Sequence, residues 1–154
     1  MYHRILIVVA DHPSTQIAIA HGLGLARVLS AEVLFVHALH HYPLAAADVA
    51  PVVTVAPDEF ARQAAELGAR LLAQARAQAA TAGVQAGALV LDAVNGVAGI
   101  AALARENTCD LIVVGAEGGN ALVRLLTGSA VSGLITRAGV PVLVCHASDP
   151  PPPA

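Results

Sequence analysis

Four residues between positions 115 and 129 have the types and the spacing of a phosphate-binding loop. Two residues separate Gly115 from Gly118, nine more precede Gly128, and Ser129 follows at once. Glycine lets backbone N–H groups approach a ligand without a Cβ in the way. Gly128 and Ser129 would open a helix, whose free N–H groups and dipole favour an anion. Taken singly, these glycines would indicate only turns and close packing; together they could hold phosphate without a lysine, which the chain lacks.

Length and composition fit one domain with a core of small aliphatic side chains. Hydrophobic residues make up 56% of the 154 positions and aromatic residues only 3%. Eight arginines stand against eleven acidic residues without a basic run, which argues against a nucleic-acid surface. The apolar run at 5–10 is short for a signal peptide, and polar residues and glycines interrupt the weakly charged stretch 77–104. We expect a cytoplasmic protein that binds neither nucleic acid nor membrane.

Apolar runs and helical periodicities alternate along the chain. The runs predict buried strands at 4–10, 32–38, 84–91, 110–114 and 140–146. Between them, the periodicity predicts a helix capped by Ser14 or Thr15, a second from Pro57 to about Gly83, a third from Asn95 to about 107, and a fourth over about 129–137. The apolar positions of the second helix give its expected buried face: Phe60, Ala64, Leu67, Leu71 and Ala75.

This alternation predicts a single α/β domain, a parallel sheet with helices on both faces. Ligands of such sheets bind beyond the carboxyl ends of the strands, where the strand order reverses, and the glycine loop follows one of those ends. We expect the domain to span residues 1–147 and the proline-rich tail, 148–154, to be disordered. The long loop at 40–56 is a hypothetical lid or partner surface.

The spacing Gly-x2-Gly-x9-Gly-Ser, followed by a short helix and a VPVLV strand, resembles the universal stress protein family. The likeness runs from RILIVVA near the N-terminus to VPVLVC near the C-terminus. In that family the motif marks the branch that binds ATP. The resemblance implies a doubly wound five-stranded sheet of order 3-2-1-4-5, the adenine nucleotide alpha hydrolase-like fold. It also implies a homodimer paired through the last strand, which begins at Val140 and ends at His146.

The resemblance further implies a ligand and the residues that hold it. The ligand would be ATP, or AMP or ADP, with or without Mg²⁺. The protein would then be a dimeric, nucleotide-dependent switch in stress response that acts on a protein partner still to be identified. Carried over by position, the nucleotide-binding residues are three at the end of the first strand, one after the second, and six in and around the glycine loop: Val9, Ala10, Asp11, Ala38, Val114, Gly115, Gly118, Gly128, Ser129 and Ala130.

Three places depart from the family pattern, one of them the turn after the third strand, which reads Val94-Asn95-Gly96 where the family tends to have Gly-x-Pro. Ala10 stands where the family has an aspartate that contacts the nucleotide, and Asp11 follows one place later. Glu117 stands where the family often has a basic residue. A carboxylate near a triphosphate costs affinity unless it points away or shares a metal ion. Ala10 and Glu117 favour the alternative, a dimeric interaction module on the same scaffold that binds no nucleotide.

Other reactive side chains point less clearly to chemistry. His37, His40 and His41 have a spacing that could serve a metal ion, but no HExxH or cysteine pattern supports one, so we assign no metal site. His12 lies beside the predicted nucleotide pocket and is a candidate contact for the nucleotide rather than a general base. The sequence has no lysine, no nucleophile elbow and no carboxylate pair that stands out. We therefore assign no catalytic residue and expect at most slow hydrolysis of ATP. Gly22-x-Gly24 falls inside a predicted helix and indicates close packing.

Overall fold

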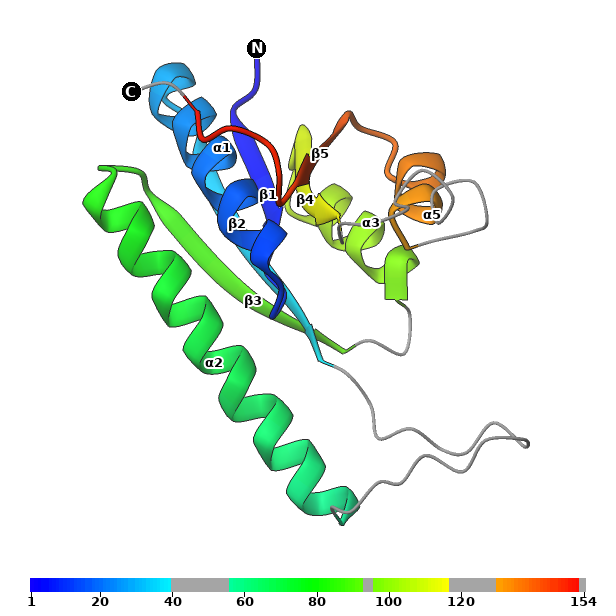
Figure 1. The fold of residues 1–154 in the computed structure, drawn as a ribbon. Coiled ribbons are helices and arrows are strands. Elements are labelled where there is room, and N and C mark those ends of the chain that lie inside the picture. The colour runs from blue at the N-terminus through cyan, green and yellow to red at the C-terminus, as the bar shows by residue number, and fades with distance from the viewer. Residues whose placement is uncertain (40–55, 93–95, 117–129, 153–154) are drawn as a thin grey trace.

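The computed structural model describes residues 1–39, 56–92, 96–116 and 130–152. Within them, five parallel strands form one sheet in the order β3-β2-β1-β4-β5, which confirms the expected fold class and strand order (Figure 1). The strands are β1 (Arg4–Val8), β2 (Glu32–Leu39), β3 (Ala86–Asp92), β4 (Leu111–Ala116) and β5 (Val142–His146). Because β1 lies between β2 and β4, the strand order reverses at its carboxyl end.

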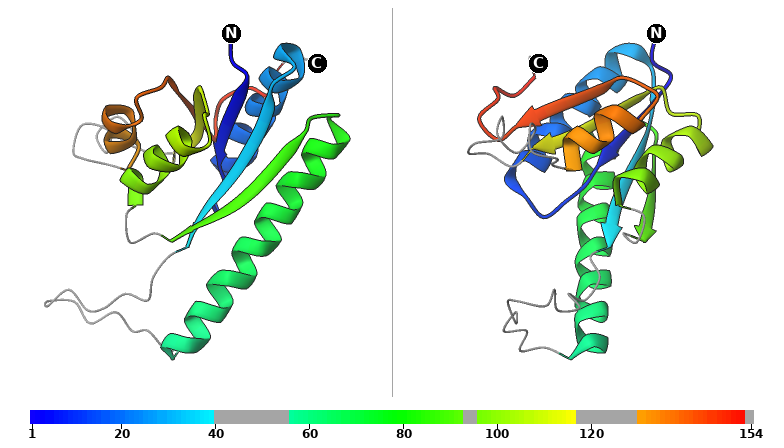
Figure 2. Two further views of the ribbon diagram at one scale, coloured as in Figure 1. Left: turned by 180° about the vertical axis from the view of Figure 1, so that it is seen from behind. Right: turned by 90° about the vertical axis from the view of Figure 1, so that its right-hand side faces the viewer.

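Among the described elements, two helices pack on each face of this sheet, and Figure 2 shows the two pairs on opposite sides. α1 (Pro13–Leu29) and α2 (Pro57–Thr81) pack on one face, where Phe35 is buried. α3 (Gly96–Glu106) and α5 (Ala130–Arg137) pack on the other, where Leu6 and Ile112 are buried. The core therefore has two layers with the sheet between them. Among the described residues, no helix combines the length and apolar character that crossing a membrane requires.

The buried face of α2 differs from the expected one. Its buried residues are Gly68, Leu72, Ala75 and Ala79, so of the expected face only Ala75 is confirmed as buried. The first turns of α2 extend past the end of the sheet (Figure 1), which leaves Phe60 and the other expected positions partly exposed. The turn at Gly68 contacts β2 because glycine has no side chain; a Cβ there would lie 2.7 Å from His37 Cδ2.

The two glycines of the Gly22-x-Gly24 pair play different roles. Gly22 faces the sheet, and a Cβ there would lie 2.4 Å from Cδ1 of Ile7, which is fully buried. Gly24 faces outward, and a Cβ there would meet only Pro152, at 3.5 Å. The close packing expected of this pair is confirmed at Gly22.

This contrast predicts opposite effects of the same substitution. Gly24→Ala should raise the free energy of unfolding by about 0.5–1 kcal/mol, because alanine favours the helix and its Cβ would make only an ordinary contact with Pro152. Gly22→Ala should lower it by about 1–3 kcal/mol through overpacking against Ile7. Urea denaturation of both variants measures the difference. Equal shifts would contradict the packing assigned to Gly22.

The amino edge of the sheet is held by polar contacts. Asp110 accepts hydrogen bonds from the backbone N–H groups of His3 (2.7 Å) and Arg4 (3.1 Å). Burial alone would raise the pKa of Asp110, but these donors outweigh it and hold the pKa below its usual value. The Arg4 guanidinium also lies 3.3 Å from the Glu32 carboxylate. These contacts fix the start of β1 to the starts of β2 and β4.

The two cysteines, Cys109 and Cys145, are free and buried. Burial raises the pKa of the Cys109 thiol to about 11. Burial also raises the pKa of Cys145. Because the thiolate is the reactive form, both side chains are suited to packing rather than to nucleophilic or redox chemistry.

Candidate functional site

The carboxyl ends of β1 and β4 lie side by side at the point where the strand order reverses. The two strands pair up to Ile7 and Val113, and the residues that follow reach the candidate site. Val9 and Val114 are buried, at 2% and 8% exposure. The Val9 N–H donates to the Val36 carbonyl at 2.8 Å, so the end of β1 is also fixed to β2. The structure thus brings the expected residues of the first and fourth strands together.

The first turn of α1 packs directly against Gly115 of β4. A Cβ on Gly115 would lie 2.5 Å from Ser14 Oγ, 2.7 Å from the Ser14 carbonyl carbon and 2.8 Å from its oxygen. Two of these three atoms are backbone, which cannot rotate away. Gly115 is therefore required for the helix to approach the strand, a role that its place in the glycine motif does not reveal. Ser14 itself is buried, at 1% exposure.

The cap of α1 corrects the expected start of this helix. We expected Ser14 or Thr15 as the N-cap, but the helix begins at Pro13 and its N-cap is His12. Proline at the first helical position has a suitable φ and lacks only an N–H that would be unpaired. The Ser14 N–H donates to His12 Nδ1 at 3.2 Å. Because Nδ1 accepts this bond, the neutral ring carries its proton on Nε2.

The hydroxyls of the first turn hold the residues around them. Ser14 Oγ lies 2.8 Å from His12 Nδ1. Thr15 Oγ1 accepts the Ala10 N–H at 3.2 Å, and Thr15 donates its own N–H to the His12 carbonyl at 3.0 Å. The Ala10 N–H therefore has a protein partner. Pro13 was the residue in the sequence that could have identified His12 as the cap.

Removing the imidazole tests this cap. His12→Ala should lower the free energy of unfolding by about 0.5–2 kcal/mol, because the Ser14 N–H loses its acceptor. His12→Asn offers an acceptor oxygen at the same position and should retain most of the stability. Thermal and urea denaturation of the two variants give the comparison. If alanine and asparagine cost the same, the imidazole does not act as the cap.

The remaining expected residues divide into two groups. Asp11 is exposed at the start of α1, and Ala38 is half-buried near the end of β2. Ala130 is the first residue of α5. Gly118, Gly128, Ser129 and the divergent Glu117 lie outside the described residues, as does the loop at 40–55. The described part of the site is therefore the rim formed by β1, β2, β4 and α1.

His37 has a structural role at this rim. Its side chain is buried, and Nδ1 lies 2.8 Å from the Val9 carbonyl oxygen. A carbonyl can only accept, so Nδ1 carries the proton. His40 and His41 lie outside the described residues, and within those residues no group of three or more His, Cys, Asp or Glu side chains is placed to hold a metal ion.

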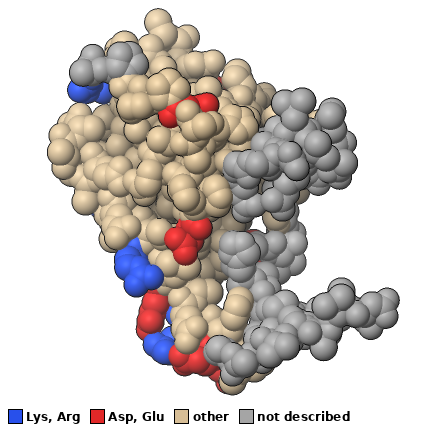
Figure 3. All heavy atoms as spheres, in the orientation of Figure 1, with Lys and Arg blue, Asp and Glu red and all other residues tan. Residues whose placement is uncertain are grey.

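The described surface carries a group of paired charges on α2. In Figure 3, the charged side chains on the visible face gather mainly toward the lower end, over the first turns of α2. There Arg62 pairs with Glu59 and with Glu66 along the helix. The charge of Arg62 is therefore balanced by two neighbouring carboxylates within the same helix.

Comparisons with known proteins agree with this arrangement. The family model described as Universal stress protein family matches residues 1–146. UspA from Lactobacillus plantarum is 21% identical with a TM-score of 0.75, covering 94% of this chain and 97% of that one. A family member from Burkholderia pseudomallei is 22% identical with a TM-score of 0.72, covering 93% and 95%. A universal stress protein in complex with cAMP is 20% identical with a TM-score of 0.70, covering 96% and 98%. Further matches hold dAMP, in a protein from Archaeoglobus fulgidus, and AMP, in one from Arabidopsis thaliana.

Proposed function

Because the chain belongs to the universal stress protein family, we propose that it binds an adenine nucleotide over the carboxyl ends of β1 and β4. The observation that carries this proposal is that Val9, Val114 and Gly115 meet at the carboxyl ends of β1 and β4, where the strand order reverses. Open α/β sheets bind ligands in that crevice. The family members that hold cAMP, dAMP and AMP support an adenine nucleotide as the ligand.

The positions of the chain's own residues suggest which part of the nucleotide each segment of the carboxyl edge would contact. Val9, Asp11 and Ala38 would line the base and ribose, since they lie at or just beyond the carboxyl ends of β1 and β2. The glycine motif would bind the phosphates through backbone N–H groups and Ser129. Ala10 has no carboxylate, and its N–H already donates to Thr15 Oγ1. The exposed Asp11 carboxylate would therefore have to replace the missing aspartate of the family pattern. ATP with Mg²⁺ is the form we propose for the physiological ligand.

The output of binding would be regulatory. We propose a homodimer paired through β5, because this strand ends the sheet and pairs only with β4 within the described chain. Nucleotide would then change the conformation or partner binding of the dimer in stress response. Measurement of mass in solution at several concentrations tests the pairing. A monomer throughout would contradict the dimer without bearing on the nucleotide.

Calorimetric titration tests nucleotide binding. Mg²⁺-ATP and AMP are titrated into the intact protein, into Gly128→Val, and into Gly119→Val as a matched change outside the motif spacing. We expect micromolar binding that Gly128→Val abolishes and Gly119→Val largely keeps. No heat of binding at millimolar nucleotide would contradict the proposal. The alternative, an interaction module that uses the same scaffold without nucleotide, would then account for Ala10 and Glu117.

A further inference from the structure

The chain turns back sharply after its last strand. The Asp149 N–H donates to the His146 carbonyl at 3.0 Å, and the His146 N–H donates to Asp149 Oδ2 at 2.7 Å. These two bonds close a turn directly behind β5. The turn directs the proline segment that follows, Pro150–Pro152, back over α1. The sequence alone predicts disorder from residue 148 onward, and it gives no sign of this turn.

The proline segment meets α1 at two points. His21 Nε2 lies 3.0 Å from the Pro150 carbonyl oxygen. One turn later on the helix, the missing side chain of Gly24 leaves room for the Pro152 ring, whose Cβ lies 3.5 Å from where a Gly24 Cβ would be. A polyproline II segment advances about 6 Å over two residues. The helix rises about 4.5 Å over the three residues from His21 to Gly24, so the two contacts lie about one turn apart on α1.

A segment of consecutive prolines suits such a contact. Proline has no backbone N–H, so the segment needs only donors from its partner, and His21 supplies one. Its backbone is already restricted to an extended form, so docking orders few additional torsions. Within the described residues, Gly24 therefore has a packing partner in the tail, whereas Gly22 packs on the sheet.

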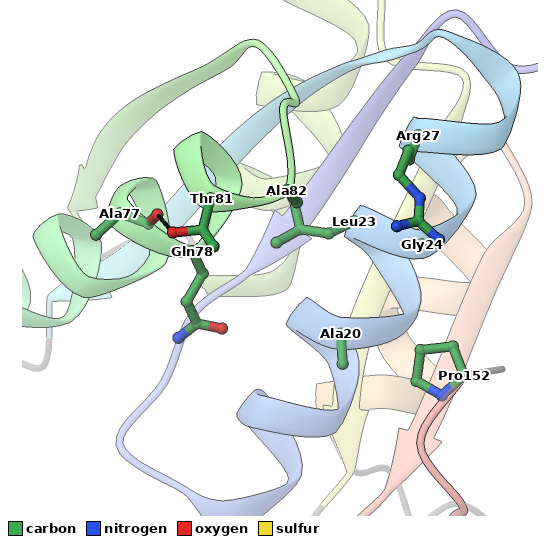
Figure 4. Close-up of a pocket in the computed structure, with 9 residues that line it drawn as sticks. All are labelled: Ala20, Leu23, Gly24, Arg27, Ala77, Gln78, Thr81, Ala82 and Pro152. Carbon is green, nitrogen blue, oxygen red and sulfur yellow. Dashed lines mark hydrogen bonds between the residues drawn. The ribbon is translucent and has the colours of Figure 1, made fainter. Parts of the chain in front are cut away.

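The docked tail also completes a pocket on the outer surface of α1 (Figure 4). The pocket has a volume of about 530 Å³. Ala20, Leu23 and Gly24 of α1 line its base, Ala77 of α2 and Ala82, the C-cap of α2, line one side, and Pro152 lies on the other side of α1. Without the tail this pocket would lose one of its two walls.

We propose that Pro150–Pro152 is an intramolecular strap that docks on the outer face of α1 at His21 and Gly24. The strap joins the end of β5 to the middle of α1 and closes one side of the pocket above the helix. It is independent of nucleotide binding, since its contacts lie on a different face from the carboxyl edge.

Backbone amide shifts of the protein shortened after Asp149 test the strap. Compared with the full chain, the shortened protein should show shifts at residues 20–27 of α1 and at 77–82, the end and C-cap of α2, which line the same pocket as Pro152. Shifts confined to residues 146–149 would overturn the proposal, because they would mean that the tail does not contact the helix.

Substitution of Gly24 provides a second test within the full chain. Gly24→Leu should keep the fold, because only the tail lies near this position, yet its side chain would occupy the place of Pro152. Its spectrum should reproduce the shifts of the shortened protein at 77–82. Ala65→Leu, on the exposed face of α2, serves as the control and should leave those residues unchanged. If Gly24→Leu matches the unmodified chain at 77–82, the strap is overturned.

Mixing distinguishes a strap within one chain from a tail that docks on a second copy. Isotope-labelled shortened protein is combined with unlabelled full chain at equal concentration. For an intramolecular strap the α1 shifts of the labelled protein stay unchanged. A return of those shifts toward the values of the full chain would show docking between copies and would overturn the intramolecular assignment.

Discussion

Gly115→Ala should destabilise the protein by about 1–3 kcal/mol, since overpacking of a close contact costs this much, and should abolish nucleotide binding. The new Cβ would lie within 2.8 Å of the backbone carbonyl of Ser14. Because Ser14 belongs to the first turn of α1, the helix would have to move away from β4. That movement would open the carboxyl edge where we place the ligand. Urea denaturation and nucleotide titration measure the two effects.

Gly87→Ala is the matched control, since Gly87 is also a strand glycine. A Cβ there would meet only Leu34 Cδ1, at the ordinary contact distance of 3.5 Å. We expect its stability to stay within about 0.5 kcal/mol of the unmodified protein, as for most surface changes. If Gly115→Ala were as stable as Gly87→Ala and still bound nucleotide, the close packing of α1 on β4 would not determine the site.

Phe35→Ala should cause the largest loss of stability, about 3–5 kcal/mol, the range for removing a buried aromatic ring. Phe35 is fully buried in β2, where it pairs with Ile7 of β1 and Ala88 of β3. In a core made mostly of Ala, Val, Ile and Leu, neighbouring small side chains cannot fill the space that the ring leaves. Urea denaturation measures the change in the free energy of unfolding.

The second phenylalanine of the chain gives a direct comparison. Phe60 lies in the first turn of α2 and is partly exposed. Phe60→Ala removes the same atoms, so its cost should be less than half that of Phe35→Ala. Similar losses for the two variants would contradict the description of α2 as a helix whose first turns extend past the sheet.

The sheet was predictable from the sequence because its strands are continuous apolar runs. β1 and β2 begin at the expected residues, Arg4 and Glu32, and each end differs by one or two positions. The strand order came from the family resemblance, since apolar runs do not specify their neighbours. The helix ends depended on local chemistry: Pro57 opens α2 as expected, whereas Pro13 moved the cap of α1 to His12.

Contacts between distant segments explain what sequence patterns missed. The buried face of α2 includes Gly68, which a search for apolar side chains passes over, because the residue packs through having none. The roles of Ser14 against Gly115 and of His37 against Val9 likewise depend on tertiary contact. The expected site residues Val9, Val114 and Gly115 do meet at one edge, and their contact with nucleotide stays a prediction.

Backbone amide shifts on addition of AMP test most directly whether the carboxyl edge binds an adenine nucleotide. We expect saturable shifts that concentrate at residues 9–15 and 114–116, where β1, α1 and β4 meet. Glu32 and Asp110, at the amino edge of the sheet, should stay unchanged and serve as the internal control. Shifts spread over the amino edge, or none at millimolar AMP, would contradict nucleotide binding at this site.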